Sequence, residues 1–171
     1  MDLMIEAAER QHFPQLRQVE LSAFETLRSA GAVSGEPMAS TDEELQRYLD
    51  DGLLYVAIDD DGDPVGYVGA TIVAEENCIH VGEMDVHPAF QGKGIGRRLL
   101  LAILNAARLR GLTFATLTTD RIAPFNARFY LTLGFALVEG TERSHRLTTI
   151  LEEEIAKGLD PSRRCAMRRE L

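Results

Sequence analysis

The chain has 171 residues, of which 45% are hydrophobic, and this length and composition suit one domain that buries one sizeable core. Its 27 acidic and 18 basic residues give a formal net charge of −9. We therefore expect no nucleic-acid or membrane partner, because most of the surface would repel phosphate groups, and any bound anion needs a local basic site.

The sequence carries no pattern of a metal site, a membrane span or a leader peptide. Cys78 and Cys165 lie in apolar stretches without the spacing of metal ligands, so we expect two reduced core residues and no bound metal. No apolar run approaches the ~18 residues of a membrane span, and residues 1–10 lack the basic and apolar regions of a signal peptide. We expect a single domain over residues 1–171, soluble and cytoplasmic.

Predicted strands and helices alternate along the chain, which is typical of an α/β protein. Apolar residues recur at helical spacing in the helices and form short or alternating runs in the strands, with glycine and proline between them. The predicted strands cover residues 3–8, 53–59, 64–74, 78–86, 113–119, 135–140 and 164–171. The predicted helices cover residues 11–28, 40–50, 95–110, 124–134 and 147–158.

Local signals mark the ends of some of these elements. Residues 30–40 contain glycine and proline and form a candidate mobile loop between the first two helices. Ser40 or Thr41 can cap the second helix, while one of the glutamates that follow reaches back toward the cap. Gly111 stands just past the third helix, where a left-handed cap is expected.

Residues 86–100, VHPAFQGKGIGRRLL, join a predicted strand to a predicted helix. Free N–H groups at such a helix start lie at the positive end of the helix dipole and suit a phosphate. Glycines let the backbone approach the anion, and basic side chains add the local charge that the rest of the chain lacks. The residues concerned are Gly92, Gly94, Gly96, Lys93, Arg97 and Arg98. The alternative is a tight turn whose basic residues only keep it soluble.

Two nucleotide-binding motifs do not fit this turn. The P-loop pattern GxxxxGK[ST] is absent, and the dinucleotide pattern G-x-G-x-x-G fails because Arg97 occupies the place of the third glycine. Neither a P-loop nor a Rossmann site is therefore predicted.

Two segments together resemble one known family. Gln91-Gly92-Lys93-Gly94-Ile95-Gly96 resembles the Q/R-x-x-G-x-G/A acyl-CoA loop of the GCN5-related N-acetyltransferase (GNAT) family. Asn126-Ala-Arg-Phe-Tyr130-Leu-Thr-Leu-Gly134-Phe135 resembles the second motif of that family, N-x-x-x-x-Y-x-x-x-G-F. The two motifs occur in the expected order, about 35 residues apart, and the pair is far more specific than either motif alone.

The resemblance implies an α/β fold with one GNAT-like domain. Its mixed, mostly antiparallel sheet would have about six to seven strands, a splay between the two central strands, and about four to five flanking helices. Acetyl-CoA, the acyl donor, would lie in the split, with its pyrophosphate on the glycine turn and its pantetheine arm along the preceding strand. The implied cofactor-binding residues are Met84, Asp85, Val86, Gln91, Gly92, Lys93, Gly94, Ile95, Gly96, Arg97, Asn126 and Tyr130.

Tyr130 is the candidate general acid. When an amine attacks a thioester, the departing thiolate needs a proton, and a phenol with a pKa of about 10 can supply it. Asn126 lies four residues earlier on the same helix face, and the resemblance gives it a contact to the CoA arm or to an ordered water. The alternative for Tyr130 is a core tyrosine whose hydroxyl bonds to the backbone.

The general base has several candidates. Strict alternation along the strand 78–86 places His80 on one face and Glu83 and Asp85 on the other, unless a bulge near Gly82 shifts the parity. His80 is similar in position to the base of some family members, and Glu83 is its rival. An interior hydrogen bond for His80, a cross-strand ion pair for Glu83, and proton loss to water or to Asp120 stay open.

The resulting prediction is an enzyme that transfers an acetyl group from acetyl-CoA to a primary amine by direct attack in a ternary complex. The acidic balance favours a small cationic amine, and a peptide or protein amine is also open. The alternative is a non-catalytic module that binds acyl-CoA or another small ligand. Tyr130 favours the enzyme, because a module without turnover has no need of a phenol there. A homodimer is also allowed by the sequence.

Overall fold

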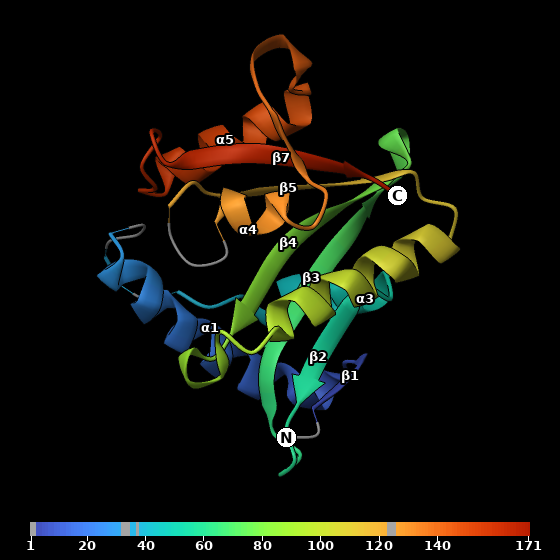
Figure 1. Cartoon of the computed structure of the whole chain (residues 1–171), viewed down its shortest axis with the longest axis vertical. Helices are drawn as coiled ribbons and strands as arrows, with labels where there is room; N and C mark the ends of the chain where they lie inside the picture. Colours follow the sequence, from blue (N-terminus) through green and yellow to red (C-terminus); the bar gives the residue numbers. More distant parts are fainter. Residues whose placement is uncertain (1–2, 32–34, 37, 123–125) are drawn as a thin grey trace.

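A computed structural model gives the structure of the protein and describes residues 3–31, 35–36, 38–122 and 126–171. Within these residues, seven strands form one sheet in the order β1-β2-β3-β4-β5-β7-β6 (Figure 1). The strands are β1 Met4–Ala7, β2 Leu54–Ile58, β3 Pro64–Val73, β4 Cys78–Val86, β5 Phe114–Asp120, β6 Ala136–Val138 and β7 Arg164–Glu170. The α-helices are α1 Phe13–Ser29, α2 Asp42–Asp50, α3 Ile95–Leu109, α4 Ala127–Leu131 and α5 His145–Ala156.

The central strands β4 and β5 separate part-way along their length. They form a parallel pair, whereas the other neighbours in the sheet are antiparallel. Residues 78–81 pair with residues 114–117, and beyond this point the two strands continue without pairing to each other. A mixed, mostly antiparallel sheet with a splay between its central strands confirms the predicted fold class.

A β-bulge changes the alternation of side chains along β4. Two neighbouring residues of β3 pair with Val81 and Glu83, which leaves Gly82 without a partner. His80 and Asp85 therefore lie on the same face of the sheet as Glu83. The shift of parity that the sequence left open is confirmed.

Tyr48 of α2 explains why glycine stands at the bulge. A Cβ at Gly82 would lie 2.3 Å from the Tyr48 hydroxyl, and a Cβ at Gly69 would lie 2.4 Å from the Tyr48 ring. The ring can therefore lie against β3 and β4 only because both strands have no side chain at these points.

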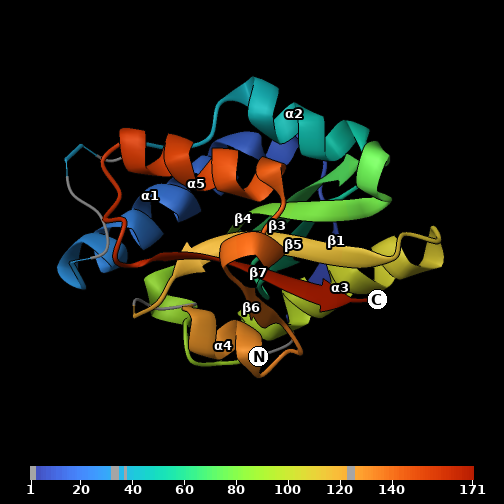
Figure 2. The same ribbon diagram turned by 90° about the horizontal axis from the view of Figure 1, so that it is seen from above.

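Helices cover both faces of the sheet. Helices α3 and α4 lie on one face, and α1, α2 and α5 lie on the other (Figure 2). The apolar residues of α3 and α4 pack with the sheet into the largest core cluster, and those of α1 and α2 form a second cluster. Leu147 and Leu151 of α5 pack on Ala166 of β7. The split between β4 and β5 thus has helices on both sides.

Helix α4 is shorter than the sequence predicted. It begins at Ala127 rather than near Pro124, because Asn126 has an extended backbone (φ −83°, ψ −179°) and its side chain caps the helix. The helix ends before Gly134, which lies in the following turn with φ +87°. Residues 124 and 125 of the predicted helix lie outside the described residues.

Side-chain caps set the starts of two other helices. The Thr41 hydroxyl, rather than that of Ser40, accepts the Glu44 N–H (3.2 Å) at the start of α2. The Ser144 hydroxyl accepts the Leu147 N–H (3.3 Å), and α5 therefore starts slightly before the predicted helix.

Three further expectations concern the loop, the membrane and the cysteines. Residues 32–34 and 37 of the predicted loop 30–40 lie outside the described residues, so its mobility stays a prediction. None of the described helices is both long and apolar enough to cross a membrane. Cys78 and Cys165 are buried and free, as predicted.

Candidate active site

The glycine-rich turn presents free amide groups at the start of α3. Gly92 and Gly94 have φ angles of +78° and +80°, which residues with a Cβ rarely adopt. The first backbone bond of the helix runs from the Arg98 N–H to the Gly94 carbonyl (3.1 Å), so the N–H groups of residues 95–97 have no acceptor within the helix. This arrangement suits a pyrophosphate, as the sequence predicted.

Some side chains of the turn form hydrogen bonds within the chain, whereas others are exposed. Gln91 donates from its side-chain nitrogen to the Val86 carbonyl (2.9 Å) and thereby holds the turn against the end of β4. Arg98 donates to a backbone carbonyl near the N-terminus (2.9 Å), so its guanidinium is engaged within the chain. Lys93 and Arg97 are exposed and are better placed to reach a phosphate.

A cavity of about 260 Å³ occupies the split between β4 and β5. Its walls come from the diverging ends of both strands, from α1 and α5 on one face of the sheet and from α4 on the other. Gln91 lies in its wall on the side of the glycine turn. Of the predicted site residues, the structure brings together Glu83, Met84, Asp85, Gln91, Asp120 and Tyr130 around this cavity.

Tyr130 lies in the wall of the cavity and is 6% exposed. Its ring meets those of Phe129 and Phe135 edge-on, at centroid distances of 5.1 and 5.7 Å. Burial, followed by the nearby charges of Asp85 and Glu83, raises the pKa of the phenol, which therefore stays protonated near neutral pH. Among the described residues the hydroxyl has no hydrogen-bond partner, so the backbone bond of the alternative interpretation is absent there.

Asn126 is engaged at both ends of its amide. The side-chain oxygen accepts the Phe129 N–H (3.2 Å), and the side-chain nitrogen donates to the Ile122 carbonyl (2.9 Å). Asn126 thus orients the first turn of α4 and with it Tyr130. Its contact to the CoA arm stays a prediction.

Three carboxyl groups cluster beside the cavity, and two of them, Glu83 and Asp85, lie in its wall. Oxygen atoms of Glu20, Glu83 and Asp85 all lie within 4.8 Å of one another. Burial raises the pKa of Asp85 to about 7, although a hydrogen bond from Glu83 opposes this shift. Burial, followed by the charge of Asp85, also raises the pKa of Glu83. The hydrogen bond between the two side chains raises the pKa of Glu83 and lowers that of Asp85, so Glu83 is the donor and Asp85 the acceptor.

Glu20 of α1 is a site residue that the sequence interpretation missed. Its carboxylate accepts the Ser40 N–H (2.8 Å), the Ser40 hydroxyl (3.0 Å) and the Tyr67 hydroxyl (3.0 Å). The available signal was its place on the apolar stripe of the helix, four residues after Leu16 and 8% exposed. A carboxylate on the buried face of a helix needs such donors.

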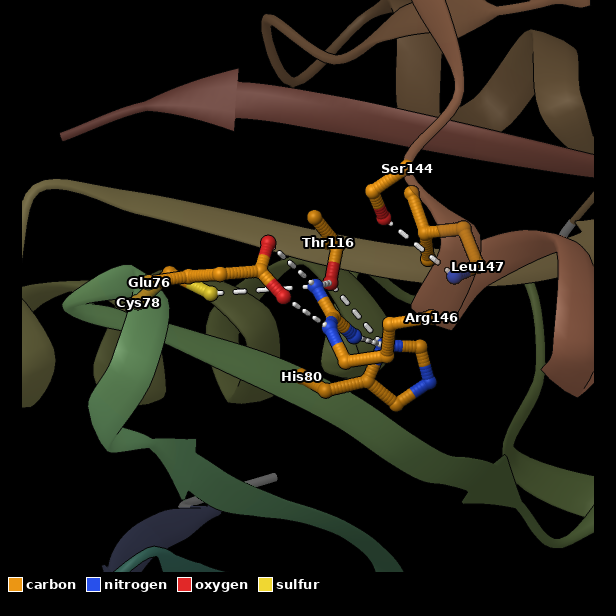
Figure 3. A network of polar contacts seen from close by, with 7 residues as sticks. All are labelled: Glu76, Cys78, His80, Thr116, Ser144, Arg146 and Leu147. Carbon is orange, nitrogen blue, oxygen red and sulfur yellow. Dashed lines mark hydrogen bonds and ion pairs between the residues drawn. The ribbon is translucent and has the colours of Figure 1, made fainter.

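His80 lies in a polar network outside the cavity wall (Figure 3). Its Nδ1 atom lies 3.2 Å from Arg146 Nη1 and 2.9 Å from the Thr116 hydroxyl. A guanidinium only donates, so Nδ1 is the acceptor and the ring proton is on Nε2. Burial, followed by the charge of Arg146, lowers the pKa of His80 to about 4. At neutral pH the ring is uncharged, and its hydrogen bonds to Arg146 and Thr116 are structural contacts.

Arg146 links β4, β5 and α5 at the base of the split. Its guanidinium forms an ion pair with Glu76 (2.6 Å) and donates to the Thr116 hydroxyl (3.0 Å) as well as to His80 (Figure 3). His80 and Thr116 are register partners on the last paired stretch of the two strands. The network therefore holds the strands together immediately before they separate.

A second ion pair lies in the cavity wall beside α5. Arg164 of β7 donates to Glu154 (2.6 Å), which also accepts the Thr118 hydroxyl (3.0 Å). Asp120, the remaining base candidate, forms an ion pair with Arg163 (3.0 Å). Sequence reasoning had no signal for these pairs, because each pair depends on how β7 and the segment before it pack against β5 and α5.

Comparison with known proteins places the chain in a family. Residues 13–135 match the family model described as the acetyltransferase (GNAT) family. The chain is 35% identical over 98 residues to the N-alpha-acetyltransferase RimI of Mycobacterium tuberculosis, and this alignment covers 55% of the chain and 59% of the relative. It is 30% identical over 86 residues to the streptothricin acetyltransferase of Streptomyces lavendulae, and this alignment covers 50% of the chain and 46% of the relative. The chain thus spans about half the length of these curated relatives.

The fold also has close structural counterparts. The PaiA N-acetyltransferase of Thermoplasma acidophilum, solved in complex with coenzyme A, aligns over 100% of both chains with a TM-score of 0.75 at 21% identity. At this identity the likeness shows the fold alone. The family model covers more than half of the chain, and both quoted motifs lie entirely within its span. The chain belongs to the acetyltransferase (GNAT) family.

Proposed function

We propose that the protein transfers an acetyl group from acetyl-CoA to a primary amine by direct attack of the amine in a ternary complex. The observation that carries the proposal is the split between β4 and β5, where one cavity is lined by Gln91, Tyr130 and the carboxyl groups of Glu83 and Asp85. Structural neighbours include complexes with coenzyme A, which supports acetyl-CoA as the acyl donor.

The donor would bind along the edge of β4 that β5 leaves unpaired. Residues 82–85 have no strand partner on that side, so their backbone groups suit the amides of the pantetheine arm. The pyrophosphate would then meet the N–H groups from Gln91 to Arg97 at the start of α3. This course brings the thioester to the cavity beside Tyr130.

Tyr130 would act as the general acid. The amine nitrogen attacks the thioester carbon, the carbon–sulfur bond breaks, and the phenol gives its proton to the thiolate. Neither cysteine lines the cavity, so an acyl-cysteine intermediate has no support among the described residues.

The acceptor class follows from charge and from the relatives. The carboxyl groups of the cavity and the net charge of −9 favour a cationic amine. The curated relatives are named for an N-alpha-acetyltransferase and for a streptothricin acetyltransferase, and one structural neighbour is a complex with a peptide and CoA. We place a small cationic amine first and a peptide α-amine second. A single domain, a cytoplasmic location and a homodimer stay predictions.

The test combines turnover with binding. Purified protein is incubated with acetyl-CoA and a panel of polyamines, amino acids, aminoglycosides and short peptides, and release of the CoA thiol is followed with a thiol reagent. We expect release that depends on one class of amine, with the acetylated product confirmed by mass spectrometry. Tight CoA binding by calorimetry without turnover on any amine supports the non-catalytic module instead.

A further inference from the structure

Arg163, in the segment between α5 and β7, links the end of α1 to the end of β5. Its Nη1 atom donates to the carbonyl of Ala30 (3.1 Å), the residue that caps the C-terminal end of α1. Its Nη2 atom donates to the Asp120 carboxylate (3.1 Å), and the Arg163 and Asp120 side chains are only 13% and 5% exposed. One guanidinium thus joins two elements that are distant in sequence.

Both partners of Arg163 need a positively charged donor. The last carbonyls of a helix have no donor within the helix and lie at the negative end of its dipole. Asp120 is buried and also accepts the Ile122 N–H (2.6 Å), so a nearby cation is needed to offset its charge. Arginine suits this place, because its planar fork presents several donors at fixed positions.

The backbone around Arg163 is also held in place. The Arg163 carbonyl accepts the N–H of Arg121 (2.8 Å), directly after β5, and the Arg163 N–H donates to the Asp160 carbonyl (3.0 Å). The Asp160 side chain accepts both the N–H (2.9 Å) and the hydroxyl (2.8 Å) of Ser162. The guanidinium is therefore presented from a turn that is fixed to the sheet.

The elements that Arg163 links form one end of the cavity, which we call the α1 end. Its wall there consists of Thr26 and Leu27 of α1, Thr119 and Asp120 of β5, and Leu159 of the segment before Arg163. Arg163 is not itself one of the described wall residues, so it can act on the cavity only through its neighbours.

The α1 end lies away from the place proposed for the donor. Helix α1 lies on the face of the sheet opposite α3 (Figure 2), whereas the glycine turn that would hold the pyrophosphate is at the start of α3. With acetyl-CoA bound at that turn, the acceptor amine would reach the thioester from the α1 end.

We propose that Arg163 is a positioning residue that fixes the C-terminal end of α1 against β5 and so sets the size of the amine that the cavity accepts. The inference rests on the proposed acetyl transfer. With the link to Ala30 in place, the α1 wall stays close to β5 and holds a small amine from both sides. Without the link the wall can move outward, so a small amine is positioned less well and a bulkier amine gains relative to it.

The principal test compares the kinetics of Arg163→Met and Arg163→Lys with a series of primary amines of increasing bulk. We expect Arg163→Met to raise the KM of the smallest accepted amine about tenfold, with kcat within about threefold of the wild type. The ratio of kcat/KM for a bulky amine to that for the small amine should rise about fivefold. CoA affinity, measured by calorimetry, should stay unchanged.

Two further variants make the kinetics interpretable. Arg163→Lys keeps a positive charge beside Asp120, but one ammonium group cannot take the places of Nη1 and Nη2 together. Its KM should lie between those of the wild type and Arg163→Met, and it decides the test if Arg163→Met does not fold. Arg121→Met is the matched control, because it removes an exposed ion pair with Glu139 next to Asp120 and should keep the wild-type KM and selectivity.

Hydrogen exchange tests the link without turnover. The amides of Ala30 and Gly31 donate within the last turn of α1 (3.1 and 3.0 Å). NMR should show these amides exchanging about tenfold faster in Arg163→Lys than in the wild type, while the amides of residues 99–104 in α3 are unchanged. An equal acceleration in α3 would show a general loss of stability and would overturn the inference.

The remaining outcomes separate this inference from the proposed function. A lower kcat at unchanged KM would mean that the Arg163–Asp120 pair acts in the chemical step, which contradicts a positioning role. Unchanged exchange at the end of α1 together with unchanged selectivity would overturn the inference even if the protein acetylates amines. Faster exchange at α1 without turnover on any amine would support the link and count against the acetyl transfer.

Discussion

The residues around Tyr130 suit the general-acid role that we propose for it. Its ring is held between two other aromatic rings, and the capped first turn of α4 sets its direction. Burial and the nearby carboxyl groups raise the pKa of the phenol, so the group is neutral and able to donate. The same ring would pack equally well without its hydroxyl. The packing of the ring can therefore be tested separately from proton donation by the hydroxyl.

Replacing Tyr130 by Phe should therefore affect turnover and little else. We expect kcat to fall by about 10²-fold or more, while CoA affinity and the midpoint of thermal unfolding stay close to the wild type. Tyr55→Phe, a half-buried change on β2 outside the cavity, is the control. Wild-type turnover in Tyr130→Phe would make the tyrosine structural.

The ionisation of Asp85 should oppose the stability of the fold. Its pKa in the folded state, about 7, lies above the ordinary value of 3.8, so the folded protein binds the proton more tightly than the unfolded chain. The stabilisation that this group contributes is complete below about pH 4 and is lost as the pH rises through 7.

Asp85→Asn should consequently stabilise the protein at alkaline pH. We expect a gain of roughly 1–3 kcal/mol in the free energy of unfolding at pH 8 and little gain near pH 4. Urea unfolding at the two pH values measures the difference, with Asp61→Asn in the exposed turn before β3 as the control. Equal effects at both pH values would show that Asp85 titrates normally in the folded state.

At the scale of the element, the start of α3 combines a helix terminus with left-handed glycines. A Cβ at Gly94 would meet no atom within 4 Å, so nothing in the fold forbids the extra carbon sterically. Replacing Gly94 by alanine would instead cost backbone conformational energy, because φ of Gly94 is +80°. The open space around it is where a bound pyrophosphate would lie.

Gly94→Ala combined with Gly96→Ala should weaken CoA binding. We expect at least a tenfold loss of affinity, about 1.4 kcal/mol, measured by calorimetry on folded protein. Gly111→Ala is a matched control, since Gly111 also has a positive φ (+78°) and open space but follows the other end of α3. Equal CoA affinity in the double variant and the control would exclude the turn as the phosphate site.

The Arg146 network acts on two strands and a helix at once. Removing the guanidinium breaks an ion pair with the half-buried Glu76 and leaves His80 and Thr116 without their shared donor. The strands would then lose a side-chain link at the point where they begin to separate.

Arg146→Met should lower the free energy of unfolding by about 1–3 kcal/mol. The pKa of His80 should rise from its low value, because the neighbouring positive charge is gone, and NMR titration of the ring measures this shift. Arg108→Met, an exposed change on α3, is the control for stability. An unchanged His80 titration would mean that burial alone lowers its pKa.

For the whole molecule, the last strand joins parts of the chain that are distant in sequence. Strand β7 pairs with β5 on one side and with β6 on the other, so the C-terminal segment completes the same sheet that begins at β1. A sheet that is shared in this way should unfold as one unit.

We therefore expect a single cooperative unfolding transition. Far-ultraviolet circular dichroism and tyrosine fluorescence should give the same midpoint in urea, because the helices and the tyrosines belong to one core. The chain has no tryptophan, so the fluorescence reports its 4 tyrosines. Two separate midpoints would contradict the expectation of a single domain over residues 1–171.

The sequence by itself determined the order of the elements, the glycine-rich turn and the acid candidate. These features depend on local rules: apolar periodicity, capping residues, and glycines whose positive φ angles start or follow a helix. The motif around Tyr130 and the glycine turn are contiguous in the chain, so they could be recognised without knowing which strands are neighbours.

Only the tertiary structure showed what surrounds each candidate base and brought Glu20 to Glu83 and Asp85. The bulge at Gly82 puts His80 and Glu83 on one face, yet His80 meets Arg146 whereas Glu83 meets Asp85 and Glu20. These contacts join β4 to α5 and α1, and no local pattern encodes them. Proton affinity depends on burial and on charges within a few ångströms, so the proton affinity of each group is set by packing between segments far apart in sequence.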